Sequence, residues 1–576
     1  MKIGKNWIKT PKIKIACYSS VIMNSICGLL GIFYLFSSSY SILWDFLGII
    51  LLITIFSNLV LVFINSRKRN GHNRFTNKFN IFGYVYLTFI IIAMVCMMLG
   101  NLLVSVTYSN QLIDNLLSYI LIYLFYFGIL IIGIVYAIFG VKTYNKINLG
   151  VENHTINIRI SRRFIKVKSI FKKIAIVISR ITFIIGIIFG IVILFGSFEI
   201  VTTFIAIVSG QFGIFFSIIF FANTIILLKL KHQRWNTKKF YRTALTGTLI
   251  SLLLLTPLFL TQFTINNIER NFSSIFGPNW REQIPVEVNN YFLETPFSLS
   301  NYFLGIPPKD CNIEKDVLFY KDEGIELYFD AYMPKSNIGG LPGANSTIVR
   351  IHGGAWVSGD KGLMNMMQMN KYFAAQGYVV FDIQYGIADN PLYALDPLTP
   401  TYKKGSFNID DMVRHIGIFT NYLTNHSEEY GANLDSVFFS GGSAGGHLSC
   451  AAALAIASGH YTDIFSANLT IKGLVPFYPA NDLMNFFGLS GSLEFKNPEN
   501  LIESDSPPCL IFQGTHDIIN YFGISREIQD TYFSKGNGNC AILWMPFGGH
   551  ASDFYFTGYY NQIFLYYMER FLYLNL

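Results

Sequence analysis

Negative charge is scarce in the first half of this 576-residue chain. Residues 1–263 contain 26 Lys and Arg against 4 Asp and Glu, whereas residues 264–576 contain 17 against 31. Charged residues make up only 14% of the chain and hydrophobic residues 52%, which is typical of a membrane protein. The contrast between the halves indicates two parts in different surroundings. Because the positive charge lies in loops between apolar runs and the second half is acidic, we expect no nucleic-acid partner.

Cysteines are few, and a cleavage site for a signal peptide is missing. The seven cysteines have no metal-ligand spacing, so the sequence predicts no metal site. We interpret Cys450, in the helix after the serine motif described below, as a small core residue rather than a reactive thiol. No small-residue cleavage site follows the first apolar run, which indicates a retained signal anchor.

Long apolar runs dominate residues 1–263. There are seven, near 15–36, 41–64, 81–106, 112–141, 174–196, 200–228 and 243–263. Each is long enough to cross a hydrocarbon core as a helix, which takes about 20 residues. The sequence therefore predicts an all-α transmembrane bundle of seven helices in this region.

The loops around these runs alternate in charge. Five, five, nine and six Lys and Arg lie in residues 1–14, 65–80, 142–173 and 229–242, respectively. No Lys or Arg lies in the alternate loops near 37–40, 107–111 and 197–199. Basic loops stay on the cytoplasmic side of a membrane. We therefore expect an integral plasma-membrane protein with a cytoplasmic N-terminus and, after seven crossings, an extracytoplasmic second half.

Ionisable residues inside the runs are few, namely Asp45, Asp114 and Arg180. Each lies near an end of its run, where its side chain can reach the interface. A transport path would place charge deeper in the bundle. We therefore interpret the helices as an anchor or scaffold.

The second half begins with a polar, Pro-rich segment, 264–310, which we interpret as a linker. Residues 311–576 then alternate between strand and helix patterns. The expected strands are 316–320, 325–333, 346–351, 378–383, 436–439, 472–477, 509–513 and 541–545. The expected helices are 362–376, 408–424, the helix after the serine motif and 554–573. This alternation predicts an α/β domain with a mostly parallel, doubly wound sheet.

One motif organises this domain. The apolar strand Val437–Phe439 is followed by Gly441-Gly442-Ser443-Ala444-Gly445, and an Ala- and Leu-rich helix comes next. A G-x-S-x-G sequence between strand and helix is typical of a nucleophile elbow, in which a sharp turn exposes the serine hydroxyl. The alternative is a Gly/Ser-rich turn without function. Ser443 is the candidate nucleophile.

A second Gly-rich turn, His352-Gly353-Gly354-Ala355-Trp356, directly follows the strand 346–351. Adjacent glycines let backbone N–H groups approach a ligand oxygen closely. We expect the N–H groups of Gly353 and Gly354, with that of Ala444, to form an oxyanion hole. A tight turn without function is the alternative.

The candidate acid and base follow the last two strands. Asp517 ends the segment Gln513-Gly514-Thr515-His516-Asp517, and Asp482 and Asp505 are its rivals. His550, in Phe547-Gly548-Gly549-His550, is the only histidine after the final strand. The order Ser, Asp, His along the chain is that of α/β-hydrolases. We expect His447, His516 and His352 to pack or to brace their own loops.

Residues 316–573 resemble the α/β-hydrolase superfamily, in particular its hormone-sensitive-lipase-like and acetyl-esterase (BD-FAE-like) branch. The motifs that carry the resemblance are His352–Trp356 with Ser358-Gly359-Asp360-Lys361, the elbow Gly441–Gly446, Gly514–Asp517 and Gly549-His550. The resemblance implies carboxylic-ester hydrolysis without a metal or organic cofactor. The chain departs from the family where Gln384-Tyr385-Gly386 replaces Asp-Tyr-Arg, so a supporting salt bridge is expected to be absent, and where Gln513-Gly514 replaces His-Gly.

The sequence thus predicts a membrane-anchored serine carboxylesterase that acts outside the cytoplasm on small or apolar acyl esters. The segments 386–407 and 481–506 are expected to roof its pocket. Alternatives are a lipase or lysophospholipase acting on membrane lipid, a peptidase of the same fold, and a non-enzymatic membrane sensor with a hydrolase-like binding domain. The sequence does not specify an oligomeric state.

Overall fold

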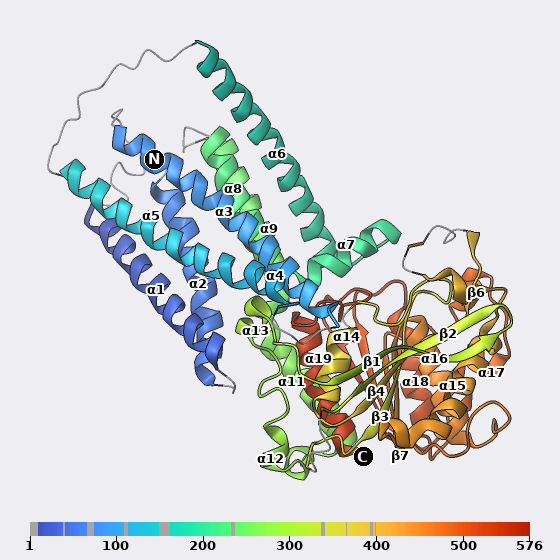
Figure 1. Ribbon diagram of the computed structural model, residues 1–576. Helices are drawn as coiled ribbons and strands as arrows, with labels where there is room; N and C mark the ends of the chain where they lie inside the picture. Colours follow the sequence, from blue (N-terminus) through green and yellow to red (C-terminus); the bar gives the residue numbers. More distant parts are fainter. Residues whose placement is uncertain are drawn as a thin grey trace.

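The chain forms a helical bundle joined to an α/β domain (Figure 1). The computed structural model describes residues 10–37, 41–65, 74–108, 113–148, 162–231, 237–335, 340–364, 366–391, 396–397 and 399–576. The bundle comprises α1 (Thr10–Phe36), α2 (Ile42–Asn65), α3 (Arg74–Ser105), α4 (Leu116–Tyr119), the π-helix η1 (Ile120–Leu124), α5 (Phe125–Asn148), α6 (Arg162–Phe195), α7 (Ile200–Gln211), α8 (Gly213–Lys231) and α9 (Lys238–Leu254). Parts of the predicted basic loops, namely residues 1–9, 66–73, 149–161 and 232–236, lie outside the described residues.

Six helical stretches in the described residues are long and apolar enough to cross a membrane. They are Lys12–Phe36, Ile42–Asn65, Phe79–Ser105, Leu116–Asn145, Ser169–Phe195 and Gly213–Lys231. The seventh predicted run, 243–263, begins within α9, which has 17 residues, and continues through α10 (Thr256–Phe259). The seven-helix count remains a prediction.

The predicted run 200–228 is not one helix. It breaks at Phe212, whose φ of −99° and ψ of 14° depart from helical values. The carbonyl of Gln211 at this break accepts a hydrogen bond of 2.9 Å from the hydroxyl of Tyr302, outside the bundle. The twelve residues of α7 span only about 18 Å, too short to cross a bilayer. In Figure 1, α7 lies across the direction of α6 and over the α/β domain.

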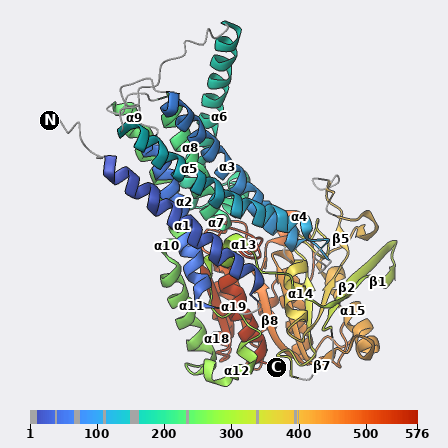
Figure 2. The ribbon, with the colours of Figure 1, turned by 60° about the vertical axis from the view of Figure 1, so that its left-hand side comes forward.

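The predicted linker 264–310 is folded against both parts of the molecule. It contains most of α11 (Thr261–Phe276), then the 3₁₀-helix η2 (Trp280–Gln283), α12 (Val286–Asn289) and α13 (Leu299–Leu304). The side chain of Asn271 donates a hydrogen bond to the carbonyl of Ile542 in the sheet, and that of Ser300 donates to the carbonyl of Trp44 in α2. Figure 2 shows α10 and α11 leading from the bundle along the side of the α/β domain.

The α/β domain contains one eight-stranded sheet in the order β1-β2-β4-β3-β7-β8-β9-β10. The strands are β1 (Asn312–Asp322), β2 (Ile325–Met333), β3 (Ser346–Ile351), β4 (Val379–Ile383), β7 (Asn433–Gly442), β8 (Ile471–Phe477), β9 (Cys509–Gly514) and β10 (Cys540–Met545). Only β2 pairs antiparallel, with β1 on one side and β4 on the other. The predicted α/β fold with a mostly parallel sheet is therefore confirmed, and the strand predictions are close to these bounds.

Helices cover both faces of the sheet, as the alternating side chains of its strands require. Val437 and Phe439 of β7 pack in one core cluster, while Phe438 between them packs in the other. The first face is covered by α15 (Ile409–Tyr430), α16 (Ala444–Ser458) and α18 (Phe522–Ser534). The second is covered by α11, α14 (Met366–Ala374) and α19 (Tyr559–Leu574).

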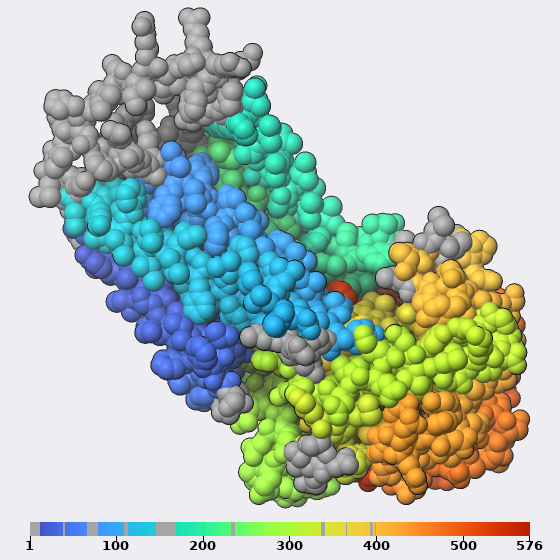
Figure 3. All heavy atoms as spheres, in the orientation of Figure 1, coloured from blue at the N-terminus to red at the C-terminus, as the bar shows by residue number. Residues whose placement is uncertain are grey.

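Short elements fill the two segments expected to roof the pocket. These are β5 (Ile387–Ala388), η4 (Thr401–Lys403), β6 (Lys404–Gly405), η5 (Met484–Phe487), α17 (Leu493–Lys496) and η6 (Pro498–Leu501). The space-filling view shows the bundle lying against the α/β domain (Figure 3).

Candidate active site

Ser443 lies at a sharp turn between β7 and α16. Its φ of 56° and ψ of −121° are strained for a residue with a side chain, and its N–H donates to the carbonyl of Phe477 over 3.0 Å. A Cβ at Gly445 would overlap the carbonyl oxygen of Ile351, and one at Gly441 would lie 2.5 Å from the same atom. Only glycine fits at both positions, so the G-x-S-x-G spacing has a steric cause here.

The Gly-Gly turn after β3 lies beside this elbow. A Cβ placed on Gly353 would be 3.5 Å from the Cβ of Ser443, and Gly354 has a φ of 118°, which favours glycine. Ala444 is the first residue of α16 and is fully buried. The predicted oxyanion residues therefore lie around Ser443. Gly353 and Gly354 lie in the turn beside it, and Ala444 follows it in the chain.

His352 holds the Gly-Gly turn from behind. Its Nδ1 lies 2.8 Å from the carbonyl of Gly353, and its Nε2 lies 3.0 Å from Nζ of Lys403. Burial, and then the charge of Lys403, lower the pKa of His352 well below its usual value. A neutral ring that donates from Nδ1 and accepts at Nε2 satisfies both contacts, so His352 braces its loop as expected.

Lys403 forms a salt bridge with Asp360, next to Gln384. Its buried ammonium lies 3.0 Å from a carboxylate oxygen of Asp360, and the side chain of Gln384 donates to the same oxygen over 2.6 Å. Burial lowers the pKa of Lys403 to about 8. The departure at Gln384–Gly386 therefore does not leave Asp360 without a cation, and the sequence analysis missed Lys403 because it lies far from the motif along the chain.

Asp517 and His550 are directly paired. Nδ1 of His550 lies 2.9 Å from Oδ2 of Asp517, and Oδ1 of Asp517 accepts the N–H groups of Ile519 and Asn520, each over 2.9 Å. Asp517 is buried, whereas the rivals Asp482 and Asp505 are exposed. This geometry can fix the orientation and tautomer of the imidazole.

Tyr478, which the sequence analysis missed, lies between the elbow and the histidine. Its ring centroid is 4.7 Å from that of His550, and a Cβ on Gly442 would lie 3.0 Å from its hydroxyl. The hydroxyl donates to Asp553 over 2.6 Å. Tyr478 could have been found in the sequence because it directly follows β8, at the same edge of the sheet as the other site residues.

Among the described residues no hydrogen bond joins Ser443 to His550. Such catalytic contacts commonly tighten only with substrate bound.

Comparisons with known proteins bear on this domain. Residues 329–531 match the family model described as BD-FAE. A probable carboxylic ester hydrolase, LipM of Mycobacterium tuberculosis, is 25% identical over 235 residues, which cover 37% of this chain and 51% of the relative. The chain thus spans about half the length of that curated relative.

Solved esterase structures are also similar to this domain. Esterase 2 of Thermogutta terrifontis is 20% identical, with 46% of this chain and 91% of that chain covered and a TM-score of 0.34. An inhibited esterase B from Lactobacillus rhamnosis is 20% identical, with 43% and 81% covered and a TM-score of 0.34. The order of the eight strands, with one antiparallel strand and a serine elbow after β7, decides the fold. The C-terminal domain has the α/β-hydrolase fold.

His447 and His516, two other histidines named in the sequence analysis, have structural contacts. His447 accepts from the indole N–H of Trp356 over 3.2 Å and its other ring nitrogen lies 2.8 Å from the carbonyl of Phe495. Burial lowers the pKa of His447 to about 4. The ring of His516 packs on Phe547 and faces Gly196, in the turn before α7. Neither pairs with Asp517 in the described part of the chain.

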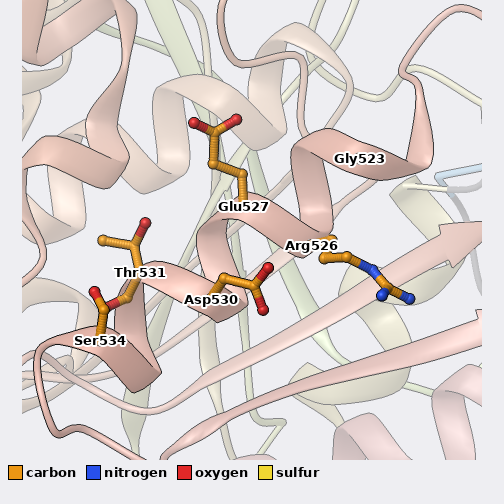
Figure 4. A pocket seen from close by; sticks show the side chains of 6 residues that line it. All are labelled: Gly523, Arg526, Glu527, Asp530, Thr531 and Ser534. Carbon is orange, nitrogen blue, oxygen red and sulfur yellow. The ribbon is translucent and has the colours of Figure 1, made fainter.

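A surface hollow of about 390 Å³ lies along α18. Its lining residues all belong to that helix: Gly523, Arg526, Glu527, Asp530, Thr531 and Ser534. Figure 4 shows the charged side chains of Arg526, Glu527 and Asp530 pointing in different directions rather than toward a common point. Convergent polar groups mark a binding site, so we assign the hollow no part in the chemistry.

Proposed function

We propose that this protein is a membrane-anchored serine carboxylesterase. Ser443 is the nucleophile, His550 the general base and acid, and Asp517 the group that orients the histidine. The N–H groups of Gly353, Gly354 and Ala444 bind the developing oxyanion. The observation that carries this proposal is the pairing of the buried Asp517 with His550, at the same sheet edge as a strained serine turn.

The reaction follows from these positions. His550 removes the proton of the Ser443 hydroxyl as its oxygen attacks the ester carbonyl carbon. The carbonyl oxygen gains negative charge, which the N–H groups of Gly353, Gly354 and Ala444 stabilise by donating hydrogen bonds. His550 then gives its proton to the leaving alcohol. Water attacks the acyl-enzyme by the same route and releases the carboxylic acid and free Ser443.

A serine-directed probe tests this proposal. We expect a fluorophosphonate to label the full-length, detergent-solubilised protein at Ser443, because an activated serine beside an oxyanion hole attacks phosphorus as it attacks a carbonyl. Mass spectrometry of the labelled peptide identifies the site, and heat-unfolded protein is the control. A folded protein that hydrolyses no acyl ester and takes up no probe would instead be a binding domain, as in the sensor alternative.

The bundle supports membrane insertion with the hydrolase domain outside the cytoplasm. Its six long apolar helices suit a bilayer. The C-terminal end of α8 carries Lys229 and Lys231, and α9 begins at Lys238. In Figure 1 these helix ends lie at the end of the bundle away from the hydrolase domain. Basic ends in the cytoplasm would therefore place the hydrolase domain on the opposite side.

Protease protection measures this orientation. Protease added to intact cells should digest sites in residues 281–576 and should spare the basic loop 142–173 until the membrane is opened. The reason is that Lys and Arg near spanning helices resist translocation. Protection of the hydrolase domain in intact cells would overturn both the outside location and the odd number of crossings.

A further inference from the structure

The inner face of α7 packs on the loop that carries His550. Ala206 contacts Gly549, since a Cβ at Gly549 would lie 3.0 Å from the Ala206 methyl carbon. The side chain of Gln211 donates to the carbonyl of Ala551 over 2.9 Å and accepts the N–H of Tyr555 over 2.7 Å. This bundle helix therefore forms a wall beside the candidate base.

The outer face of α7 is apolar and uncovered. Val201 and Phe204 are 59% and 66% exposed, while Thr202, Thr203 and Ala206 on the other face are buried. Glu199, at the helix N-cap, is the only charged residue between Arg180 and Lys229. Figure 3 shows α7 at the surface of the molecule. A helix with one apolar face that is too short to span fits the surface of a bilayer.

The apolar surface continues onto the hydrolase domain. In the loop after Asp517, Ile518 and Tyr521 are 44% and 56% exposed. His516, just before Asp517, faces Gly196 in the turn from α6 to α7, where a Cβ would lie 3.3 Å from its ring. That turn directly follows the apolar stretch Ser169–Phe195. One apolar surface thus runs from the predicted span Ser169–Phe195, across α7, to the loop that contains Asp517.

We propose that α7 lies in the bilayer surface and that the active site takes its esters from that surface. The substrate class is an amphiphilic ester with a long acyl or alkyl chain that stays in the lipid while the ester group reaches Ser443. This proposal rests on the esterase function proposed above. Its occupant is lipid, because the patch is continuous with the apolar surface of α6 and Glu199 is the one charged residue in residues 181–228.

The position of α7 is tested without any activity. A fluorophore that brightens in apolar surroundings is attached to Val201→Cys, and to Phe533→Cys as a control on α18, where Phe533 is 45% exposed. All seven native cysteines are buried or half-buried, and labelling of the unaltered protein gives the blank. In phosphatidylcholine vesicles, a lipid with a nitroxide near its headgroup should quench the probe at position 201 and not the one at 533.

The substrate class is tested by two esters in the same vesicles. We expect the unaltered protein to hydrolyse both a long-chain ester that resides in the bilayer and p-nitrophenyl acetate dissolved in the water. The double variant Val201→Gln, Phe204→Gln should lower the ratio of the long-chain rate to the acetate rate about tenfold, because two apolar side chains leave the lipid. Phe533→Gln should leave this ratio unchanged. Since the spanning helices remain, detachment from the membrane cannot produce the effect.

The other possible results contradict the place of α7, the substrate class or the proposed function separately. Equal or absent quenching at the two positions, or quenching that depends on protein density, would overturn the place of α7 and favour a second copy of the chain as its cover. Hydrolysis of acetate without the long-chain ester, or an equal loss of both rates in the double variant, would overturn the substrate class alone. No hydrolysis of either ester would overturn the proposed function, and the quenching result would still stand.

Discussion

Ser443→Ala is expected to lower the kcat of ester hydrolysis by a factor on the order of 10⁶, the loss typical of removing the serine from a Ser-His-Asp triad. The variant keeps the oxyanion N–H groups and the binding surfaces, which alone give about 10³–10⁴-fold acceleration over water. Steady-state rates on a short-chain p-nitrophenyl ester measure the loss, with the protein in detergent micelles.

The fold should survive this change. Ser443 makes its recorded elbow hydrogen bond through its backbone N–H, which alanine keeps, and removal of one oxygen opens little space. Ser458→Ala, at the far end of the same helix, is the matched control and should retain full activity. A folded Ser443→Ala protein with near-normal turnover would contradict the assignment of the nucleophile, and the search would move to another residue of the same loop cluster.

The fold was largely predictable because its elements are local in sequence. The strand β3, predicted at 346–351, is a short run rich in β-branched residues and bounded by turn residues, and the structure has the same bounds. Helix ends were less accurate. The helix predicted at 362–376 begins at Met366, because Gly362 has a positive φ of 72° and its N–H donates to the carboxylate of Asp382 rather than within a helix.

The nonlocal contacts around the site could not be read from the sequence. Tyr478 and Lys403 carry no motif, and their contacts with His550 and His352 appear only once β8 and η4 are placed. The break at Phe212 lies beside a contact between Gln211 and Tyr302, 91 positions apart. The same holds for the segment predicted as a linker, since the polar composition of 264–310 does not reveal that α11 packs on β10 and α13 on α2.

Asp517→Asn is expected to lower kcat by up to about 10⁴, through the tautomer of His550 rather than through loss of a charge alone. Oδ1 of Asp517 accepts two backbone N–H groups, so the oxygen of an asparagine would stay there and its NH₂ group would face the imidazole. Nδ1 of His550 would then have to accept, which leaves the proton on the ring nitrogen that must receive the serine proton.

Asp482→Asn is the matched control for this change. Asp482 follows the neighbouring strand β8 but is exposed, so its variant should keep kcat within a factor of about two. Both proteins are compared at equal folded concentration on the same ester. The opposite ranking would assign the orienting carboxylate to the end of β8. Because asparagine preserves the volume of the side chain and both backbone hydrogen bonds, a large loss in Asp517→Asn with unchanged thermal unfolding isolates the effect on the proton of His550 from any effect on the fold.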